Sequence, residues 1–344
     1  MISTDNINVV SIKPLPSPND IKKLYPITQN TYRSINEYRN NICGIINKTD
    51  NRLLVIMGPC SIHDEDVVRD YSNRLLRIRD DYPNLFIVMR VYFEKPRTIA
   101  GWKGLIMDPD LDGSCDITKG LCLARKIMVE LVNKGIPIAC EFLDTISAQY
   151  ISDLVSYGAI GARTTQSQLH RQMSSGLSVP IGFKNTTDGN IIIPLNSILS
   201  SKVSHTFLGV NIHGQASIVE TKGNTSCHLI LRGGDSPNYF KACIRDATKK
   251  SLERHIHSGI VVDCSHANSC KNYLNQKNVV GDICRQLQDD ACNIVGVMIE
   301  SNIYEGKQPL VTKEELQYGI SITDSCVGFP ESIVLLTTLN NAIS

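Results

Sequence analysis

The chain has no long hydrophobic run, no excess of charge of one sign and no closely spaced cysteine pair. It carries 35 Lys and Arg against 34 Asp and Glu, so no global basic field favours nucleic acid or an anionic membrane. No apolar run approaches the roughly 20 residues that cross a bilayer, and no basic start followed by an apolar core marks a secretory signal. We therefore expect a cytoplasmic protein with neither a nucleic-acid nor a membrane partner.

Twelve cysteines are scattered from Cys43 to Cys326 without a C-x-x-C pair. In the absence of a secretory signal, this pattern predicts reduced thiols that mostly fill the core, with one of them free to act as a ligand. Hydrophobic residues make up 42% of the chain and charged residues 20%, a globular composition that excludes wholesale disorder.

Short apolar runs recur eight times from residue 52 onward, and each is nearly continuous rather than alternating. This pattern is typical of parallel strands covered on both faces by helices. The segments between the runs show apolar spacings of three and four, so they predict helices, as in VVRDYSNRLLRIRDDY. The runs cover residues 52–60, 85–93, 136–142, 159–165, 179–185, 227–234, 260–266 and 293–301.

These eight strand-helix units span about 250 residues, the typical size of a (β/α)8 barrel, or TIM barrel. An open doubly wound sheet is the alternative, but eight units favour closure. We divide the chain into an N-terminal extension, 1–51, outside the main core, and a catalytic barrel domain, 52–344. Two alternating segments in 205–224 predict a β-hairpin inserted between the fifth and sixth barrel strands. The extension and the hairpin are candidates for regulation or subunit contacts; a hairpin that merely packs is the alternative.

Active sites of β/α barrels lie at the C-terminal ends of the strands, so the polar residues that close each run are the candidate site residues. Five cations and only two carboxylates lie there. Pairing among them would leave positive charge unpaired at a position where desolvation is costly. A small ligand with a phosphate and a carboxylate would balance it, whereas separate pairing with neighbouring loops is the alternative. The strand-end residues are Cys60, Arg90, Lys95, Glu141, Arg163, Lys184, Arg232, His266 and Glu300.

A thiol, an imidazole and two carboxylates come together if Asp324, in the loop after the last strand, joins Cys60, His266 and Glu300. This mixture of soft and hard donors suits a divalent transition metal such as Mn, Fe, Co or Zn better than Mg or Ca. A nucleophilic Cys60–His266 pair is the competing interpretation, on the expectation that the two residues follow adjacent strands of the closed barrel.

Ten ordered motifs make the chain similar to a known family. They are GPCSIHD (58–64), RVYFEKPRT (90–98), GWKGLI (101–106), EFLD (141–144), GAIGARTT (158–165), GFKN (182–185), ILRGG (230–234), SHANS (265–269), IES (299–301) and SITD (321–324). The chain thus resembles the class I 3-deoxy-D-arabino-heptulosonate 7-phosphate (DAHP) synthases, the microbial type regulated by aromatic amino acids. The resemblance implies a metal-dependent condensation of phosphoenolpyruvate with erythrose 4-phosphate, the first step of the shikimate pathway.

The resemblance also implies roles for individual residues. Lys95, Cys60 and His266 are expected to be catalytic. The implied metal ligands are Cys60, His266, Glu300 and Asp324. The implied phosphoenolpyruvate contacts are Arg90, Lys95, Arg163, Lys184 and Arg232, with Glu141 nearby, and the erythrose 4-phosphate contacts are Lys95, Pro96, Arg97 and Thr98.

Two positions depart from the family pattern. Gln166 stands where the family usually has Glu, and Thr186 where it usually has Gly. Neither change removes an implied ligand, but a threonine would strain any backbone position that needs a positive φ.

An effector pocket is the last implication of the resemblance. Residues matching positions that line the family's aromatic amino acid pocket are Gln149, Ser178, Phe207, Gly209 and Val219. Gly209 would leave room for a phenolic hydroxyl, which favours Tyr as the effector; lost regulation is the alternative. The resemblance also predicts a homodimer or homotetramer.

Other functions remain open at this stage. A related synthase acting on another aldose phosphate, or a metal-assisted aldolase, is disfavoured by the KPRT segment, 95–98. A non-catalytic barrel that senses sugar phosphates is disfavoured by the intact Cys/His/Glu/Asp set.

Overall fold

Eight parallel strands close into a barrel in a computed structural model that describes residues 4–99, 101–289 and 292–343. Their order around the barrel is β1-β10-β9-β8-β5-β4-β3-β2. The strands are β1 (Leu53–Gly58), β2 (Leu85–Arg90), β3 (Ile138–Glu141), β4 (Tyr157–Ile160), β5 (Ile181–Lys184), β8 (Cys227–Leu231), β9 (Ile260–Asp263) and β10 (Ile294–Glu300). The predicted (β/α)8 barrel is confirmed, although β4 begins two residues before the apolar run that predicted it.

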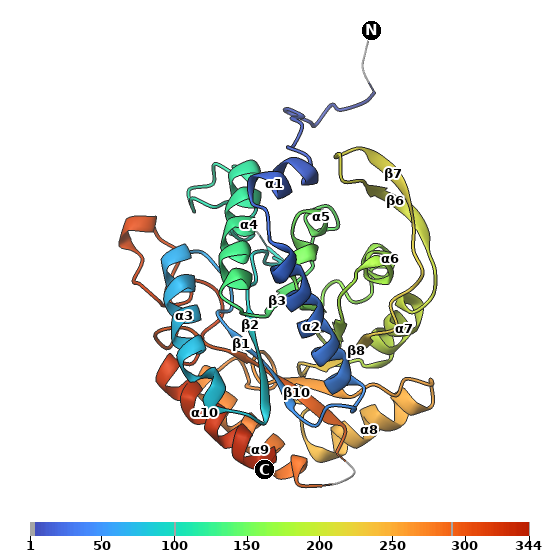
Figure 1. The fold of residues 1–344 in the computed structure, drawn as a ribbon, viewed down its shortest axis with the longest axis vertical. Coiled ribbons are helices and arrows are strands. Elements are labelled where there is room, and N and C mark those ends of the chain that lie inside the picture. Colours follow the sequence, from blue (N-terminus) through green and yellow to red (C-terminus); the bar gives the residue numbers. More distant parts are fainter. Residues whose placement is uncertain (1–3, 100, 290–291, 344) are drawn as a thin grey trace.

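Helices surround the barrel (Figure 1). They are α1 (Pro18–Leu24), α2 (Gln29–Ile46), α3 (Glu65–Ile78), α4 (Ile117–Asn133), α5 (Ala148–Ile151), α6 (Gln168–Gly176), α7 (Ile192–Ser201), α8 (Lys241–Leu252), α9 (Gln276–Leu287) and α10 (Phe329–Ile343). Helix α3 illustrates why they form: the Asp64 side chain caps its first turn by accepting from the N–H groups of Asp66 and Val67. None of the helices among these residues is long and apolar enough to cross a membrane.

Each barrel strand has one face toward the helices and one toward the lumen. On β2, Leu85, Ile87 and Met89 pack with the surrounding helices, whereas Phe86 and Val88 belong to a second cluster inside the barrel. The lumen cluster also takes Leu54 and Ile56, Ala139, Tyr157 and Ala159, Ile230, Val261 and Met298. Because side chains alternate along a strand, the next inward position on each strand lies one layer closer to the C-terminal mouth.

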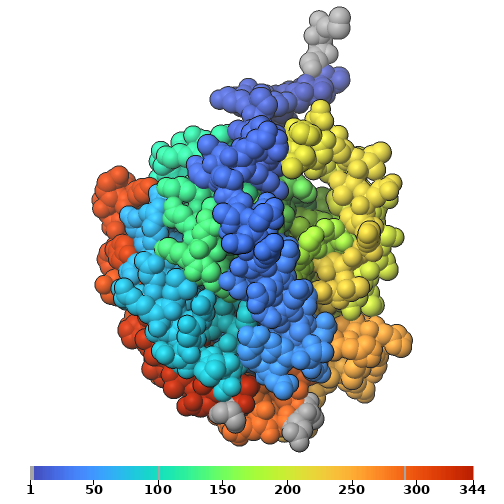
Figure 2. Space-filling view, viewed as in Figure 1, coloured from blue at the N-terminus to red at the C-terminus, as the bar shows by residue number. Residues whose placement is uncertain are grey.

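The N-terminal extension contributes to the core more than the sequence suggested. Ile42, Ile45 and Ile46, in the last turns of α2, pack into the lumen cluster with Phe86 and Val295. The backbone N–H of Gly259 donates to the carbonyl of Ile46 at 2.8 Å. Residues of α1 and α2 form a continuous blue band over one face of the barrel in Figure 2. The end of helix α2 therefore packs into the barrel floor and belongs to the core.

The inserted hairpin lies between the fifth and sixth barrel strands, as predicted. It pairs β6 (Thr206–Val210) with β7 (Ala216–Glu220) in antiparallel register, with Phe207 opposite Val219. The N–H of Asn19 donates to the carbonyl of Ile212 at 2.9 Å, so the hairpin turn contacts the start of α1.

One ionisable pair is sealed in the lumen and makes stability depend on pH. The Tyr157 hydroxyl and His228 Nε2 lie 2.8 Å apart, and burial lowers the pKa of His228 from 6.5 to about 4. A histidine with a lower pKa in the folded state binds fewer protons when folded. Acidification from pH 6.5 to pH 4 therefore favours the unfolded state.

We expect the His228→Gln variant to escape this loss. The wild-type free energy of unfolding should fall by about 2 kcal/mol more than that of the variant between pH 7 and pH 5, measured by urea denaturation. His257→Gln, at an exposed position, is the control and should follow the wild type. Equal acid sensitivity of wild type and His228→Gln would contradict the prediction.

Candidate active site

A layer of charged side chains ends the inward faces of the strands at the C-terminal mouth. Arg90, Glu141, Lys184 and Glu300 are the last residues of their strands and occupy this layer. Above it lies a cavity of about 500 Å³. Ten of the predicted residues line this cavity: Lys95, Pro96, Arg97, Glu141, Arg163, Lys184, Arg232, His266, Glu300 and Asp324. Cys60 and Arg90 are buried and absent from the lining, and Thr98 is exposed outside it.

Three of the four predicted metal ligands converge. A donor atom from each of Cys60, Glu300 and Asp324 lies within 4.8 Å of the other two. His266 is outside this mutually close group, but its Nε2 lies 3.9 Å from Glu300 Oε1. A thiol and two carboxylates with an imidazole beside them fit the ligand preferences of a divalent transition metal.

The expected adjacency of Cys60 and His266 is wrong. Cys60 follows β1 and His266 follows β9, and β10 lies between these strands because the last strand closes the barrel against the first. The thiol contacts Lys95 and Asp324 instead, and no Cys60–His266 hydrogen bond occurs among the described residues. A nucleophilic Cys-His pair therefore has no geometric support.

Lys95 holds the thiol in place. Its Nζ donates to the Cys60 carbonyl at 3.0 Å and lies 3.1 Å from Cys60 Sγ. Burial, together with Glu300, raises the pKa of Cys60 to about 11, and a bound cation would lower it. Burial opposes the charge on Lys95, but Cys60 and Glu300 outweigh that effect, and the pKa of Lys95 is raised. Lys95 is thus a cation and a donor at the cavity edge.

Arg90 lies beneath the cavity in an ion pair with Glu300. The Nη2–Oε1 distance is 3.0 Å, and both side chains are 1% exposed. The guanidinium also stacks over the Tyr92 ring, 4.0 Å from its centroid, while Nη1 has no hydrogen-bond partner among the described residues. A buried donor without a partner is costly, so this nitrogen is suited to donate a hydrogen bond to an anion bound at the mouth.

The five strand-end cations are less unbalanced than the sequence suggested. Arg90 pairs with Glu300, and Lys184 pairs with Asp263 at 2.8 Å. Among the residues with described positions, only loop residues Arg163 and Arg232 of this set have neither a carboxylate within 4.0 Å nor a thiol contact. Burial lowers the pKa of Arg232, which indicates that its charge is poorly solvated. The uncompensated charge therefore lies at these two arginines.

The sequence missed two sets of residues that shape the mouth. Asp263 ends β9 on its inward face, and the period-two alternation of IVVD could have identified it. Asn185, from the GFKN motif, accepts from the Arg232 backbone N–H at 2.8 Å and donates to the Gly233 carbonyl at 2.8 Å. Gly233 has φ +77°, and a Cβ there would lie 2.7 Å from the Asn268 nitrogen, so the turn beside Arg232 requires glycine.

The two departures from the family pattern cause no strain at the mouth. Thr186 is not among the residues with positive φ, and its hydroxyl donates to Asp188 and to the Asn190 carbonyl. Gln166 is exposed.

A second cavity of about 500 Å³ lies between α2, α6 and the hairpin, and all five residues predicted for the effector pocket line it. The N-terminal extension contributes Tyr32, Ile35, Asn36 and Arg39 to the same cavity. Arg39 donates to the carbonyls of Ser152 and Val155 at 2.8 and 2.9 Å, which attaches α2 to the segment before β4.

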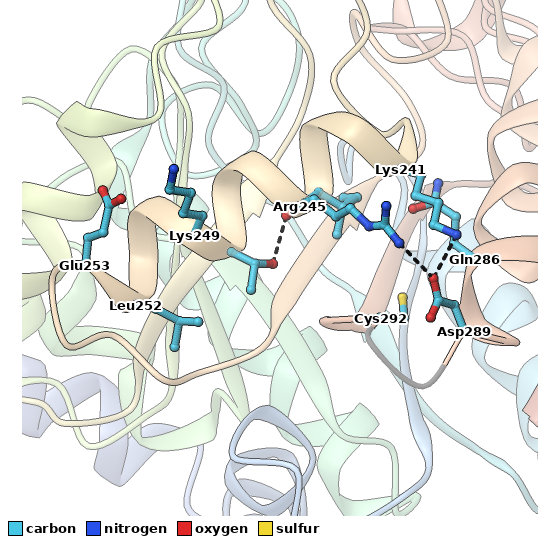
Figure 3. A pocket seen from close by; sticks show the side chains of 10 residues that line it. Lys241, Arg245, Lys249, Leu252, Glu253, Gln286, Asp289 and Cys292 are labelled. Carbon is cyan, nitrogen blue, oxygen red and sulfur yellow. Dashed lines mark hydrogen bonds and ion pairs between the residues drawn. The ribbon is translucent and has the colours of Figure 1, made fainter.

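A third cavity, of about 420 Å³, lies on the outer surface along α8 (Figure 3). Lys241 and Arg245 on its rim both reach Asp289, at 2.8 and 3.4 Å. None of the predicted site residues lines it.

The buried Arg90–Glu300 pair should be essential for stability. Arg90→Met leaves the Glu300 carboxylate buried without its cation, and we expect the free energy of unfolding in EDTA to fall by about 3–5 kcal/mol. Arg285→Met breaks the exposed Arg285–Asp282 pair and should cost less than about 1 kcal/mol. Similar losses in the two variants, measured by urea denaturation, would contradict this view of the pair.

Comparisons with known proteins agree with the resemblance seen in the motifs. The model of the DAHP synthetase I family matches residues 25–335. The Phe-sensitive phospho-2-dehydro-3-deoxyheptonate aldolase of Escherichia coli K12 is 45% identical over 340 residues, covering 98% of this chain and 97% of the relative. The Trp-sensitive enzyme of Buchnera aphidicola subsp. Baizongia pistaciae is 46% identical over 344 residues, covering 100% and 99%.

The solved structure of phospho-2-dehydro-3-deoxyheptonate aldolase from Francisella tularensis SCHU S4 superimposes with a TM-score of 0.95 at 42% identity, covering 98% of both chains. The likeness extends over nearly the whole length in both sequence and fold. This chain belongs to the DAHP synthetase I family.

Proposed function

We propose that the chain condenses phosphoenolpyruvate with D-erythrose 4-phosphate and water, giving DAHP and phosphate. The main support is the position of the Cys60/Glu300/Asp324 group. It lies at the same barrel mouth as the two arginines that have no carboxylate partner among the described residues. A single cavity thus offers a metal-binding donor set and uncompensated positive charge, which together suit an anionic substrate pair.

The cations of the mouth would bind phosphoenolpyruvate. Arg163 and Arg232 suit its phosphate because a guanidinium can donate two parallel hydrogen bonds to phosphate oxygens. Arg90 would supply its unpartnered Nη1 from below, and Lys184 and Lys95 line the same cavity. Glu141 also lines this cavity, and its carboxylate would repel a ligand with excess negative charge.

Erythrose 4-phosphate would bind along residues 95–98, with Arg97 on its distal phosphate. Arg97 Nε donates to the Trp102 carbonyl at 2.8 Å, which leaves its other nitrogens for the ligand. A new carbon–carbon bond joins C3 of phosphoenolpyruvate to the aldehyde carbon. Water adds to C2, and the carbon–oxygen bond to phosphate breaks. Fixing both anions brings the reacting carbons together, which is a large part of the rate enhancement expected.

Cys60, His266, Glu300 and Asp324 would hold the divalent metal, with Mn, Fe, Co or Zn as candidates. Such an ion supplies Lewis acidity toward the aldehyde oxygen of the second substrate. Lys95, at 3.1 Å from the thiol, would hold positive charge between the metal ligands and the substrates.

The second cavity would bind an aromatic amino acid, with Tyr as the favoured effector. Relatives named Phe-, Trp- and Tyr-sensitive are 45%, 46% and 43% identical, so overall identity does not distinguish the effectors. A Cβ at Gly209 would lie 2.7 Å from Val219 Cγ2, so only glycine keeps this wall clear. Loss of regulation is the competing possibility.

Residues 1–51 and the hairpin, which touch each other at Asn19 and Ile212, would provide regulatory and subunit contacts in a homodimer or homotetramer. A cytoplasmic location is supported by the cysteines, all twelve of which are free thiols.

The metal role predicts a specific loss of activity. Phosphate release from phosphoenolpyruvate plus erythrose 4-phosphate should stop in EDTA and return with Mn²⁺ or Co²⁺. Cys60→Ala should lower turnover by about 100-fold or more, because changes even one shell beyond a metal cost about 10–100-fold. Cys243→Ala, on α8, is the matched control and should keep full activity.

Circular dichroism should show that Cys60→Ala remains folded. Turnover unaffected by thorough metal removal would overturn the metal role. Turnover with other aldose phosphates but not with erythrose 4-phosphate would overturn the substrate assignment.

The effector assignment predicts inhibition by Tyr above Phe and Trp. Gly209→Ser should weaken Tyr inhibition about tenfold or more, because the added side chain meets Val219, while uninhibited activity stays the same. Gly281→Ser, where a Cβ meets nothing within 4 Å, is the control. Stronger inhibition by Phe or Trp would overturn the choice of Tyr, and no inhibition by any of the three would indicate lost regulation.

A further inference from the structure

A buried carboxylate, that of Asp263, joins the two halves of the mouth. Asp263 is the last residue of β9 and is 0% exposed. Its Oδ2 accepts from Lys184 Nζ at 2.8 Å and lies 2.9 Å from His266 Nδ1, which also has the Ser265 hydroxyl oxygen at 2.7 Å. Its Oδ1 accepts from the backbone N–H of Ser265 at 3.0 Å and from the Ser265 hydroxyl at 2.6 Å. Both oxygens are therefore engaged by groups of the site.

The contact with His266 determines which ring nitrogen carries the proton. The Ser265 hydroxyl donates its one proton to Asp263 Oδ1, so its oxygen accepts from His266 Nδ1 at 2.7 Å. The Asp263 carboxylate oxygen 2.9 Å from Nδ1 favours a proton on the same nitrogen. In the neutral imidazole, Nε2 then keeps its lone pair, and it lies 3.9 Å from Glu300 Oε1. A carboxylate behind the imidazole is the usual arrangement for a metal-binding histidine, since it fixes the tautomer and the ring orientation.

The contact with Lys184 is more deeply buried than the contact with His266, whose side chain is 20% exposed. Lys184 and Asp263 are 4% and 0% exposed, so solvent screens their pairing very little. One charged oxygen is thus shared between a predicted metal ligand and a predicted phosphoenolpyruvate contact.

We propose that Asp263 is a positioning residue that orients His266 toward the metal and holds back the charge of Lys184 from the substrate anion. The inference rests on the proposed metal site. It deepens that site by naming the group that ties metal affinity to phosphoenolpyruvate affinity.

Opposite effects on the two ligands follow. Without the carboxylate, His266 loses its fixed tautomer and the metal binds more weakly. Lys184 loses a competing acceptor and the mouth gains one unit of positive charge, so phosphoenolpyruvate binds at least as tightly as before. Local damage to the fold would instead weaken both ligands together.

The test compares wild type with Asp263→Asn, which keeps the side-chain volume. Co²⁺ is titrated into metal-stripped protein, and the thiolate-to-Co²⁺ absorption gives the dissociation constant. Phosphoenolpyruvate binding to the metal-free protein is measured by calorimetry. We expect Asp263→Asn to raise the Co²⁺ dissociation constant by about 10–100-fold. The phosphoenolpyruvate constant should stay within twofold of the wild type or fall.

Two further variants make the outcome specific. Asp282→Asn, an equivalent change at the exposed pair with Arg285, should alter neither constant. In a His266→Ala background, Asp263→Asn should change the Co²⁺ constant by less than twofold, because its effect on the metal passes through His266.

An unchanged Co²⁺ constant in Asp263→Asn, or a parallel loss of both ligands, would overturn the positioning role. Failure of the wild type to bind Co²⁺ at all would overturn the proposed metal site, and this inference with it. These failures are distinguishable because the first leaves wild-type metal binding intact.

Discussion

The period-two alternation of strands in a closed barrel is the constraint on which the site depends. Every inward position from the barrel floor upward is apolar or uncharged until the last layer, where β2, β5 and β10 end in Arg90, Lys184 and Glu300. Charges in that layer are buried, so a charge without a partner is costly. The Arg90–Glu300 and Lys184–Asp263 pairs avoid this cost between strands that are far apart in sequence but are separated in the barrel by one strand, β1 or β8.

Pairing within the layer divides the cations into two kinds. Those on the strands are neutralised and rigidly held, whereas Arg163 and Arg232 stand in loops above them without carboxylate partners among the described residues. Because these strand-end charges are already fixed before a ligand binds, little reorganisation is needed during the reaction. The strand ends thus provide a preorganised base, and the loops provide the net positive charge that an anionic ligand needs.

The mouth cavity and the second cavity are connected by a short stretch of structure. Glu94, next to Lys95, accepts a hydrogen bond from the Ser147 hydroxyl at 2.9 Å, and Gln149, two residues further on, lines the second cavity. Helix α2 lines that cavity with Arg39 and packs into the barrel floor with Ile42. A ligand in the second cavity would therefore touch elements that also support the mouth.

The sequence by itself determined the barrel, its eight strands, the inserted hairpin and the residues at the strand ends. Each of these follows from local information, because apolar runs, helical spacing and motifs can be recognised in short segments without knowledge of their tertiary contacts. It also predicted most residues of the mouth, since the C-terminal ends of parallel strands share one rim.

Only the tertiary structure decided which of these residues touch. Closure places β10 between β1 and β9, which separates Cys60 from His266 and brings Glu300 between them. Asp263 lies beside both Lys184 and His266, and no pattern in the sequence predicts these two contacts. The physical reason is that the partner of a buried charge is chosen by three-dimensional distance and desolvation, and these exist only once the barrel has closed.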